Sequence, residues 1–348
     1  MKNVRELVRP NIRNLKPYSS ARNEFQGNAS VFLDANESPY NEPFNRYPDP
    51  LQWKLKDKIA SVRKVERTSI FLGNGSDEPI DLLIRAFCEP GIDTILSIDP
   101  SYGMYQVAAD INHVACHKIR LNDDFSLDAS DLLQAVGPHT KLIFLCSPNN
   151  PTGNILSREE IYKVLSGFEG IVVIDEAYID FSSSPTFLRE LTQFPNLVVL
   201  QTLSKAWGGA GIRLGMAFAS PEIVGILNKI KYPYNINQLT QERALELLNR
   251  EEAMKGELLE ILNERTRMET ALREFPFVKK IFPSDANFLL VKVDDPNAIY
   301  HYLVEEGIIV RNRHTVTLCE GCLRITIGAP EQNKRLLERL AERLLING

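Results

Sequence analysis

The sequence predicts an α/β protein in which helices cover both faces of a mostly parallel or mixed sheet, followed by a smaller α+β lobe. Three observations predict this fold class. The chain has 348 residues, which is more than one compact core of ordinary size accommodates. Short apolar, β-branched runs alternate with helical patterns from about residue 68 to residue 230. After about residue 234 the pattern changes to long helical segments and a few short strands.

Strands are predicted where short apolar runs end in polar or glycine-containing turns. In the first lobe these runs are Asp93–Ile98, Lys141–Cys146, Ile171–Ile174, Leu197–Leu200 and Leu214–Ala219. Helical patterns between several of them lie at Ile80–Phe87, Tyr102–Ile111 and Arg158–Phe168. Because strand–helix alternation of this kind returns each strand to one sheet in the same direction, it favours a mostly parallel sheet.

The second lobe begins with a long segment of helix-forming residues, Leu239–Phe275, in which apolar residues recur at helical spacing. This pattern predicts a long connecting helix pair. Strands at Phe288–Val293, Ile308–Val310 and Leu323–Ile327 and helices at Asn297–Glu306 and Glu331–Leu345 are predicted to follow. We therefore expect an N-terminal arm at residues 1–30, a large domain at residues 31–238 and a small C-terminal domain at residues 239–348.

The composition is that of an ordinary globular protein, with 44% hydrophobic and 24% charged residues and a formal net charge of −5. No block of like charges suggests a nucleic-acid or membrane-surface partner, and no apolar run reaches membrane-spanning length. The first residues lack the apolar stretch of a signal peptide, and the five cysteines are an odd number, so we expect reduced thiols in the cytoplasm. The single CxxC, from Cys319 to Cys322, is interpreted as a glycine-containing turn in preference to a metal or redox site, and no metal is expected.

The strongest candidate for chemistry is Lys205, in Thr202-Leu-Ser-Lys-Ala-Trp-Gly-Gly-Ala-Gly-Ile-Arg213, which follows a predicted strand. A lysine that forms a Schiff base needs a rigid, partly desolvated position so that its amine can be unprotonated. Glycines let the backbone approach a bulky cofactor, and Thr202, Ser204 and Arg213 offer hydroxyl and guanidinium donors to a phosphate. The alternative is a surface lysine in a glycine-rich turn.

Asp175 ends the apolar strand at residues 171–174 and is followed by Glu-Ala-Tyr178. A buried carboxylate at this place is costly unless it is paired with a cation. The pyridinium nitrogen of pyridoxal phosphate is such a cation, and keeping it protonated makes the cofactor ring an electron sink. Tyr178 can then hydrogen-bond the ring hydroxyl. The alternative is that Asp175 caps the next helix.

Two further turns follow strands of the same predicted sheet. In Cys146-Ser-Pro-Asn-Asn150-Pro-Thr-Gly, the fixed turn can aim the Asn150 amide at the ring hydroxyl, or it is a plain turn between a strand and a helix. In Gly73-Asn-Gly-Ser76-Asp77-Glu-Pro, backbone N–H groups and Ser76 at a helix N-terminus make an anion site, while Asp77 is equally interpreted as a first-turn helix acid. Tyr102 follows the next strand and stacks on the ring or belongs to the core.

These motifs all lie at the ends of strands of one predicted sheet. Because open α/β sheets bind ligands outside the carboxyl ends of their strands, we expect the motifs to converge on one cofactor. A nucleotide-binding dehydrogenase is disfavoured, since the sequence has no GxGxxG motif.

With these motifs in this order, the chain resembles the fold-type-I pyridoxal-phosphate aminotransferases over nearly its whole length, which implies a seven-stranded-type sheet in the large domain. Further motifs narrow the resemblance to the histidinol-phosphate aminotransferases of histidine biosynthesis: Leu33-Asp-Ala-Asn36-Glu-Ser-Pro, Asn45-Arg-Tyr47-Pro, Leu83-Ile-Arg-Ala-Phe-Cys-Glu-Pro, Tyr102-Gly-Met-Tyr105 and Cys322-Leu-Arg324-Ile-Thr-Ile-Gly. The resemblance implies that histidinol phosphate and 2-oxoglutarate are converted reversibly to imidazole-acetol phosphate and glutamate.

The resemblance also implies roles for individual residues. Lys205 carries the cofactor and shuttles a proton, Asp175 pairs with the pyridinium nitrogen, and Asn150 and Tyr178 hold the ring oxygen. The residues implied to contact the ring face and the cofactor phosphate are Tyr102, Ser76, Asp77, Thr202, Ser204 and Arg213, with Tyr47 reaching the phosphate of the other subunit of a homodimer. The residues implied to bind substrate are Arg324, assisted by Arg311 and Tyr18, and Asn36. For Arg311 and Arg324 the alternative is a surface salt bridge.

Other enzymes of this fold use the same cofactor residues. An aromatic-amino-acid aminotransferase and a threonine-phosphate decarboxylase therefore stay as alternatives. A non-catalytic pyridoxal-phosphate sensor is disfavoured, because the aminotransferase pattern spans the chain and leaves no segment for an additional DNA-binding module.

Overall fold

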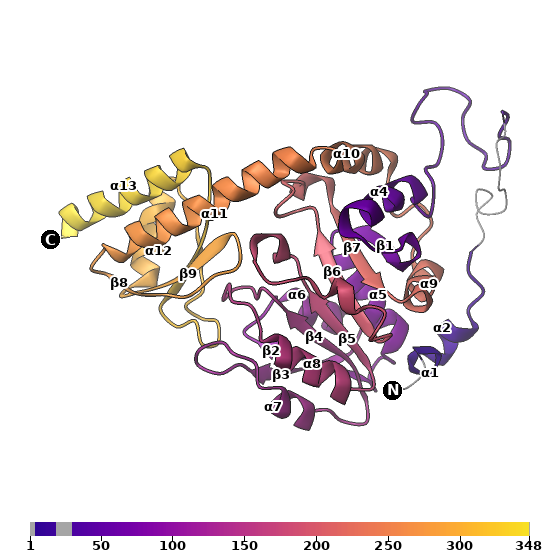
Figure 1. The fold of residues 1–348 in the computed structure, drawn as a ribbon, viewed down its shortest axis with the longest axis horizontal. Coiled ribbons are helices and arrows are strands. Elements are labelled where there is room, and N and C mark those ends of the chain that lie inside the picture. The colour runs from indigo at the N-terminus through magenta and orange to yellow at the C-terminus, as the bar shows by residue number, and fades with distance from the viewer. Residues whose placement is uncertain (1–3, 19–29, 348) are drawn as a thin grey trace.

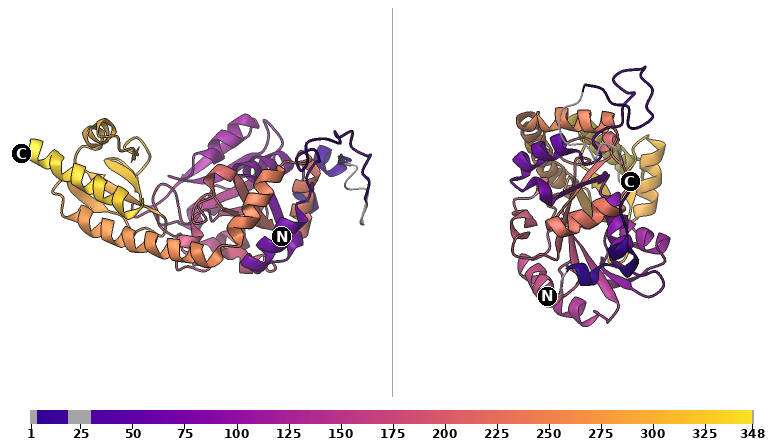
Figure 2. Two further views of the ribbon diagram at one scale, coloured as in Figure 1. Left: turned by 90° about the horizontal axis from the view of Figure 1, so that it is seen from above. Right: turned by 90° about the vertical axis from the view of Figure 1, so that its right-hand side faces the viewer.

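The protein consists of a large lobe and a smaller lobe joined by one long helix, as the computed structural model shows (Figure 1). The structure describes residues 4–18 and 30–347. The large lobe contains a seven-stranded sheet and the small lobe a four-stranded sheet. Seen from above, the lobes lie end to end, and the long helix runs from the large lobe along the small one (Figure 2).

The seven-stranded sheet has the strand order β1-β7-β6-β5-β4-β2-β3. Its strands are β1 (Ile70–Asn74), β2 (Thr94–Asp99), β3 (Ala115–Arg120), β4 (Thr140–Cys146), β5 (Ile171–Asp175), β6 (Leu197–Thr202) and β7 (Leu214–Ala219). The pairs from β6 to β3 are parallel, whereas β7 is antiparallel to both β6 and β1. The predicted α/β class with a mostly parallel sheet is therefore confirmed. The short connection between β6 and β7 explains why β7 alone is reversed, since a parallel return needs a long crossover.

Strand side chains alternate between two apolar layers, because successive residues of a strand point to opposite faces of its sheet. On one face, Phe71 and Phe144 pack in a cluster with α5 (Asp77–Phe87), α6 (Met104–Ile111) and α9 (Pro221–Ile230). On the other face, Leu72 and Ile143 pack in a cluster to which α4, α7 and α8 contribute. These helices are α4 (Trp53–Arg63), α7 (Ala129–Gln134) and α8 (Arg158–Gly167). Burial on both faces fixes the sheet as a rigid platform.

The predicted helix pair at residues 239–275 is present as α10 (Gln238–Leu248) and α11 (Glu251–Arg273). The small sheet is antiparallel, with the order β10-β11-β9-β8. Its strands are β8 (Val278–Ile281), β9 (Phe288–Val293), β10 (Arg311–Asn312) and β11 (Cys322–Thr326), and its helices are α12 (Pro296–Glu305) and α13 (Pro330–Asn347).

The strand predicted at Ile308–Val310 is wrong. The strand of this region is β10, at Arg311–Asn312, and it pairs with β11. The N–H of Ile308 donates to the carbonyl of Leu303 at the end of α12 (2.7 Å), so the apolar run belongs to the turn that leaves the helix. Within the run only Val310 is buried, and Ile309 is exposed, so an apolar run here does not indicate strand pairing.

The first residues of the predicted arm pack against the large lobe. Short helices α1 (Val4–Leu7) and α2 (Pro10–Asn14) lie beside it, and Val4 and Leu7 are buried in the cluster formed around α5. Arg9 adds an ion pair with Glu89 at 3.1 Å. Residues 1–3 and 19–29 of the predicted arm lie outside the described residues. None of the described helices combines the length and the apolar composition needed to cross a bilayer.

Candidate active site

A cavity of about 660 Å³ lies between the carboxyl ends of the parallel strands and the β10–β11 hairpin. Twelve of the residues singled out from the sequence line it. They are Ser76, Asp77, Tyr102, Asn150, Asp175, Tyr178, Thr202, Ser204, Lys205, Arg213, Arg311 and Arg324. The predicted convergence of strand-end motifs is therefore present as geometry, whereas the role of each residue stays a prediction.

One end of the cavity is a tight backbone cradle around Gly75. The Gly75 N–H donates to the carbonyl of Arg213 (2.8 Å), and Gly75 has a φ of +70°. A Cβ on the neighbouring Gly215 would lie 2.2 Å from the backbone of Gly75 and Ser76, so only glycine lets β7 approach this turn. Ser76 and the start of α5 stand at the cradle, where N–H groups at a helix N-terminus favour an anion.

Polar side chains from three elements surround this cradle. The Arg213 guanidinium lies 3.6 Å from the Asp77 carboxylate, and the Tyr102 hydroxyl donates to the same carboxylate at 3.0 Å. The Thr202 hydroxyl donates to the Ser204 hydroxyl (2.9 Å) and accepts the Ser204 N–H (3.1 Å). Asp77 therefore orients both Arg213 and Tyr102, a positioning contact that its place in the first turn of α5 makes possible.

Asp175, at the end of β5, is 2% exposed. Its Oδ2 accepts the Tyr105 hydroxyl (2.8 Å), and its Oδ1 accepts the N–H of Ala177 (3.0 Å). Burial raises the pKa of the Asp175 carboxyl, which the hydrogen bonds from Tyr105 and Ala177 only partly offset. No lysine or arginine of the described residues lies within 4 Å of this carboxylate. The arrangement fits a cationic ring nitrogen supplied by a ligand.

Tyr105 was not singled out for a role from the sequence. It lies inside the apolar pattern of α6, and its ring stacks on Phe144, 4.8 Å between centroids. Only its hydroxyl reaches the site. The sequence does contain a signal for this residue, namely a tyrosine within an apolar helical pattern. A buried hydroxyl requires a hydrogen-bond partner, so such a tyrosine indicates a polar group nearby.

The Lys205 side chain projects into the cavity from the turn after β6, where it is accessible to solvent within the cavity. Its Nζ lies 5.4 Å from the centre of the Tyr178 ring. Desolvation by the cavity walls lowers the pKa of the Lys205 amine, and the Arg324 guanidinium lowers it further. Both effects shift the equilibrium toward the neutral amine that nucleophilic attack requires.

Asn150 joins the two lobes at the cavity. Its Oδ1 accepts a hydrogen bond from Nη1 of Arg324 on β11. Its Nδ2 stays available as a donor to a ligand oxygen, the type of contact that was predicted for this residue. The Tyr178 ring packs edge-on against Phe288, with 5.3 Å between centroids, which holds its hydroxyl at the cavity.

Three predicted site residues lie outside the cavity of this chain. Tyr18 is 73% exposed, and Asn36 stands in an exposed segment with a φ of 54°. Tyr47 stacks on Tyr234, with 4.5 Å between ring centroids. None of them is among the lining residues.

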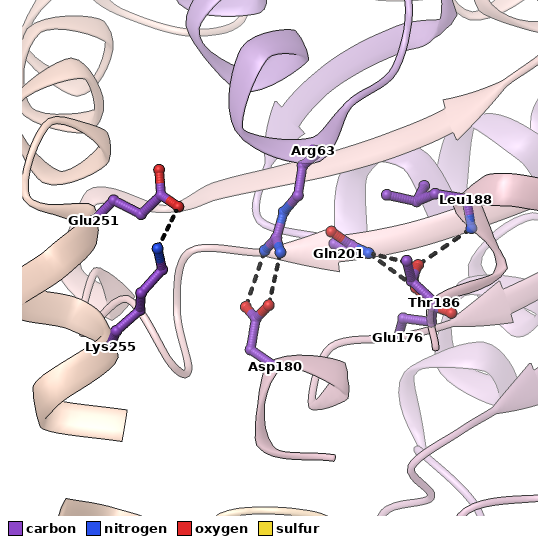
Figure 3. A network of polar contacts seen from close by, with 8 residues as sticks. All are labelled: Arg63, Glu176, Asp180, Thr186, Leu188, Gln201, Glu251 and Lys255. Carbon is purple, nitrogen blue, oxygen red and sulfur yellow. Dashed lines mark hydrogen bonds and ion pairs between the residues drawn. The ribbon is translucent and has the colours of Figure 1, made fainter. Parts of the chain in front are cut away.

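A polar network behind the cavity fixes the ends of β5 and β6 (Figure 3). Glu176 accepts the Thr186 hydroxyl (2.5 Å), the Phe187 N–H (2.6 Å) and the Gln201 amide (2.9 Å). Burial raises the pKa of Glu176 to about 7. Because Glu176 follows Asp175 and Gln201 precedes Thr202, the network links the two strand ends that carry the cofactor candidates.

An ion pair, also drawn in Figure 3, holds α4 to the turn that follows Tyr178. Arg63 binds Asp180 through two hydrogen bonds, at 2.6 and 2.9 Å (Figure 3). Both side chains are largely buried, so this bidentate pair is held in one geometry.

The cysteines show no reactive environment. All five are free, and burial raises the pKa of Cys319 to about 12 and that of Cys322 to about 11. Gly321 between them has a φ of +80° in a turn closed by the Cys322 N–H and the Cys319 carbonyl (2.9 Å). Among the described residues, no group of His, Cys, Asp and Glu side chains is arranged to hold a metal ion.

A family model described as aminotransferase class I and II matches residues 22–340. The chain belongs to this family. The histidinol-phosphate aminotransferase of Parabacteroides distasonis is 66% identical to it over 340 residues, which cover 98% of this chain and 99% of the relative. That of Bacteroides fragilis is 58% identical over 341 residues, again 98% of this chain and 99% of the relative.

A solved aminotransferase structure agrees with this assignment. The histidinol-phosphate aminotransferase from Clostridium acetobutylicum has a TM-score of 0.80 and 27% identity, and the match covers 86% of this chain and 91% of that chain. In an aminotransferase, an accessible lysine of lowered pKa beside a buried carboxylate is the expected arrangement for holding and activating a cofactor.

Proposed function

We propose that this aminotransferase uses pyridoxal phosphate and transfers an amino group between histidinol phosphate and 2-oxoglutarate, reversibly, in histidine biosynthesis. The products are imidazole-acetol phosphate and glutamate. One observation carries the proposal: a single cavity holds Lys205 beside Asp175 at one end and, at the other, arginines that have no carboxylate partner among the described residues. The full-length relatives named above support the choice of substrate.

The residues present fit pyridoxal phosphate. Asp175 is a buried carboxylate that lacks a cation, and the pyridinium nitrogen would supply one. Gly215 lets β7 pack against the Gly75 and Ser76 backbone, and the N-terminus of α5 at this turn suits a phosphate. The donors that would hold this phosphate are Ser76, Thr202, Ser204 and Arg213, with Asp77 orienting the guanidinium. When bound, the cofactor supplies an electron-withdrawing ring that accepts the electron pair of the broken Cα–H bond.

The chain's own residues do the rest. The Lys205 amine, whose pKa is lowered, would take the proton from the substrate Cα and deliver it to C4′, the aldehyde carbon of the cofactor. Asn150 Nδ2 and the Tyr178 hydroxyl would donate to the ring oxygen, and Tyr102, fixed by Asp77, would cover the ring face. The buried strand ends of β5 and β6 form the floor of this end of the cavity.

The arginine end binds the substrate anion. Arg324 and Arg311 face each other across β10 and β11 and line the cavity. Histidinol phosphate presents a phosphate to them, and glutamate presents a carboxylate in the other half-reaction. A planar guanidinium fork pairs with either anion, so one site serves both substrates.

The enzyme acts as a homodimer in the cytoplasm. Tyr47 is 51% exposed and lies outside the cavity of its own chain, which suits a side chain that completes the cofactor phosphate site of the other subunit. Tyr18 and Asn36 complete the substrate site. The five free thiols suit a reducing compartment.

Replacing the lysine tests the cofactor role directly. Lys205→Ala should lower turnover by at least about 10³-fold, because it removes the group that transfers the proton. It should also abolish the visible absorbance of the lysine-linked cofactor. Turnover retained at the wild-type rate would refute the assignment of Lys205.

A substrate panel tests the specificity. The wild-type enzyme would be assayed with 2-oxoglutarate and histidinol phosphate, phenylalanine, tyrosine or threonine phosphate as the amino compound. We expect the highest kcat/KM with histidinol phosphate. A preference for phenylalanine would assign an aromatic-amino-acid aminotransferase instead, and carbon dioxide release from threonine phosphate would assign a decarboxylase.

A further inference from the structure

The β10–β11 hairpin presents a third arginine to the cavity. Arg311 lies directly opposite Arg324 in the antiparallel register, so the two side chains share one face of the small sheet. Arg313 follows Arg311 by two positions, the spacing that returns a side chain to the same face, and it also lines the cavity. The Arg313 N–H donates to the carbonyl of Cys322 on β11 (2.9 Å), which fixes its backbone beside the hairpin.

This arrangement places three positive charges together without a protein anion. No carboxylate of the described residues lies within 4 Å of Arg311, Arg313 or Arg324. The Nε atoms of Arg313 and Arg324 are buried and have no hydrogen-bond partner. Like charges that face each other across a strand pair are destabilising, and an unpaired buried donor adds a further cost.

The pKa directions agree with this geometry. Burial lowers the pKa of Arg313, and the neighbouring Arg311 lowers it further. Burial likewise lowers the pKa of Arg324, and its largest electrostatic cause is Arg313. At the opposite end of the cavity the situation differs, because Arg213 has the Asp77 carboxylate at 3.6 Å. Among the residues that the structure describes, the arginines at the hairpin end therefore have no carboxylate to balance their charge, whereas Arg213 has one.

We propose that Arg313 is a substrate-binding residue that makes the hairpin end of the cavity prefer a doubly charged phosphate ester to a singly charged carboxylate. This inference rests on the proposed function and adds the residue that sets its specificity. Arg324 gives one Nη to Asn150, so its fork is partly engaged, and Arg311 is exposed. Arg313 supplies the additional donors that a phosphate with three free oxygens accepts.

The charge of the ligand predicts how the two substrates respond to the loss of Arg313. The Coulomb energy between a cation and a ligand is proportional to the ligand charge. Removing one guanidinium therefore lowers the binding free energy of a dianion by about twice as much as that of a monoanion. Because affinity depends exponentially on free energy, the factor by which dianion binding weakens is the square of the factor for the monoanion. A loss of about fivefold for a carboxylate corresponds to a loss of about 25-fold for a phosphate dianion.

The experiment compares Arg313→Gln with the wild-type holoenzyme in both half-reactions at pH 8. We expect KM for histidinol phosphate to rise by about 25-fold or more, KM for glutamate by about fivefold, and kcat to change by less than about threefold. Arg313→Lys retains the charge without the planar guanidinium, so its KM for histidinol phosphate should lie between those of the wild type and Arg313→Gln. The matched control is Arg189→Gln, which removes an exposed arginine outside the cavity and should leave both KM values unchanged.

Equal increases of KM for both substrates, or a fall of kcat with KM unchanged, would overturn the proposal. A second measurement tests the role of Arg313 separately from the proposed function. It compares inhibition by inorganic phosphate with inhibition by acetate, using whichever amino donor the wild type accepts. If histidinol phosphate is not a substrate, the proposed function fails. The inference still stands if Arg313→Gln weakens inhibition by phosphate more than inhibition by acetate, and it falls if the two inhibitors respond alike.

Discussion

At the scale of single residues, the proposed cofactor site requires that Asp175 stays charged. Its buried carboxyl has a raised pKa, and the Tyr105 hydroxyl at 2.8 Å stabilises the charged form. Tyr105→Phe removes that donor, so the pKa of Asp175 rises further and the charged form is lost at a higher pH. We expect the acid limb of the kcat/KM profile to move to higher pH and cofactor affinity to fall by about tenfold.

The control for Tyr105→Phe is Tyr162→Phe. The Tyr162 hydroxyl also donates to a carboxylate, that of Glu190 at 2.5 Å, but it lies outside the cavity lining. Its loss should leave the pH profile unchanged. An unchanged acid limb in Tyr105→Phe, measured with saturating cofactor, would contradict the role given to Tyr105.

Glu176 carries a prediction about stability. Its pKa is about 7 in the folded protein against 4.5 for the free group, because burial disfavours the charged form. Between these values the folded protein holds a proton that the unfolded chain has released, so the free energy of unfolding falls as the pH rises. The expected contribution is about 3 kcal/mol, fully lost above pH about 7. Denaturant unfolding at pH 5 and pH 8 would measure it.

Glu176→Gln is the comparison for that measurement. Glutamine does not titrate, so the difference in unfolding free energy between pH 5 and pH 8 should shrink by about 3 kcal/mol relative to the wild type. A variant with the same pH dependence as the wild type would show that other groups cause it.

At the scale of elements, β7 packs directly against the backbone of the turn before α5, and this close approach requires glycine at position 215. A Cβ at Gly215 would lie 2.2 Å from the Gly75 backbone, so Gly215→Ala forces the Gly75 cradle and β7 apart. We expect a destabilisation of about 1–3 kcal/mol together with weaker cofactor binding. The control is Gly225→Ala in α9, where nothing lies within 4 Å and alanine should stabilise by about 0.5–1 kcal/mol. Equal effects of the two substitutions, measured by unfolding and cofactor titration, would contradict this requirement for glycine.

The elements that the sequence predicted well are those buried on both faces. Strands β4, β5 and β6 are continuous apolar runs, which only a covered sheet tolerates. Strand β3 was not predicted individually, because it is an edge strand and most of its residues are exposed. Strand β8 was not predicted either, since Lys279 and Lys280 interrupt its apolar pattern. Such strands are defined by hydrogen bonds to a neighbouring strand, and the local sequence pattern does not reveal that pairing.

The site could be predicted to the extent that its residues follow strands. Asp175, Asn150 and Lys205 stand at strand ends, so the sheet brings them together. Arg313 was missed because its position depends on the register of β10 with β11, which the misplaced strand at residues 308–310 obscured. The proposed role of Tyr47 rests on the resemblance alone, because no local pattern in the sequence encodes a contact with a second subunit.

At the scale of the whole molecule, the proposed dimer predicts that two inactive variants complement each other. When Lys205→Ala and Tyr47→Ala subunits are dissociated and mixed equally, half of the dimers are mixed, and each mixed dimer has one intact site. About one quarter of wild-type activity should return. Mixing Lys205→Ala with Arg324→Ala is the control and should restore nothing, since both residues line the cavity of their own chain. No recovery in the first mixture would place Tyr47 outside the site.

Helix α11 has a mechanical consequence for the same molecule. Its 23 residues extend for about 35 Å along both lobes. A tilt of about 5° at its junction with α10 would displace the far end by about 3 Å, the length of one hydrogen bond. Substitutions at Asn249 or Arg250, between α10 and α11 and outside the cavity lining, would therefore be expected to change the width of the cavity. If the small lobe moves with α11, substrate fit would depend on the stiffness of a joint that lies outside the cavity lining.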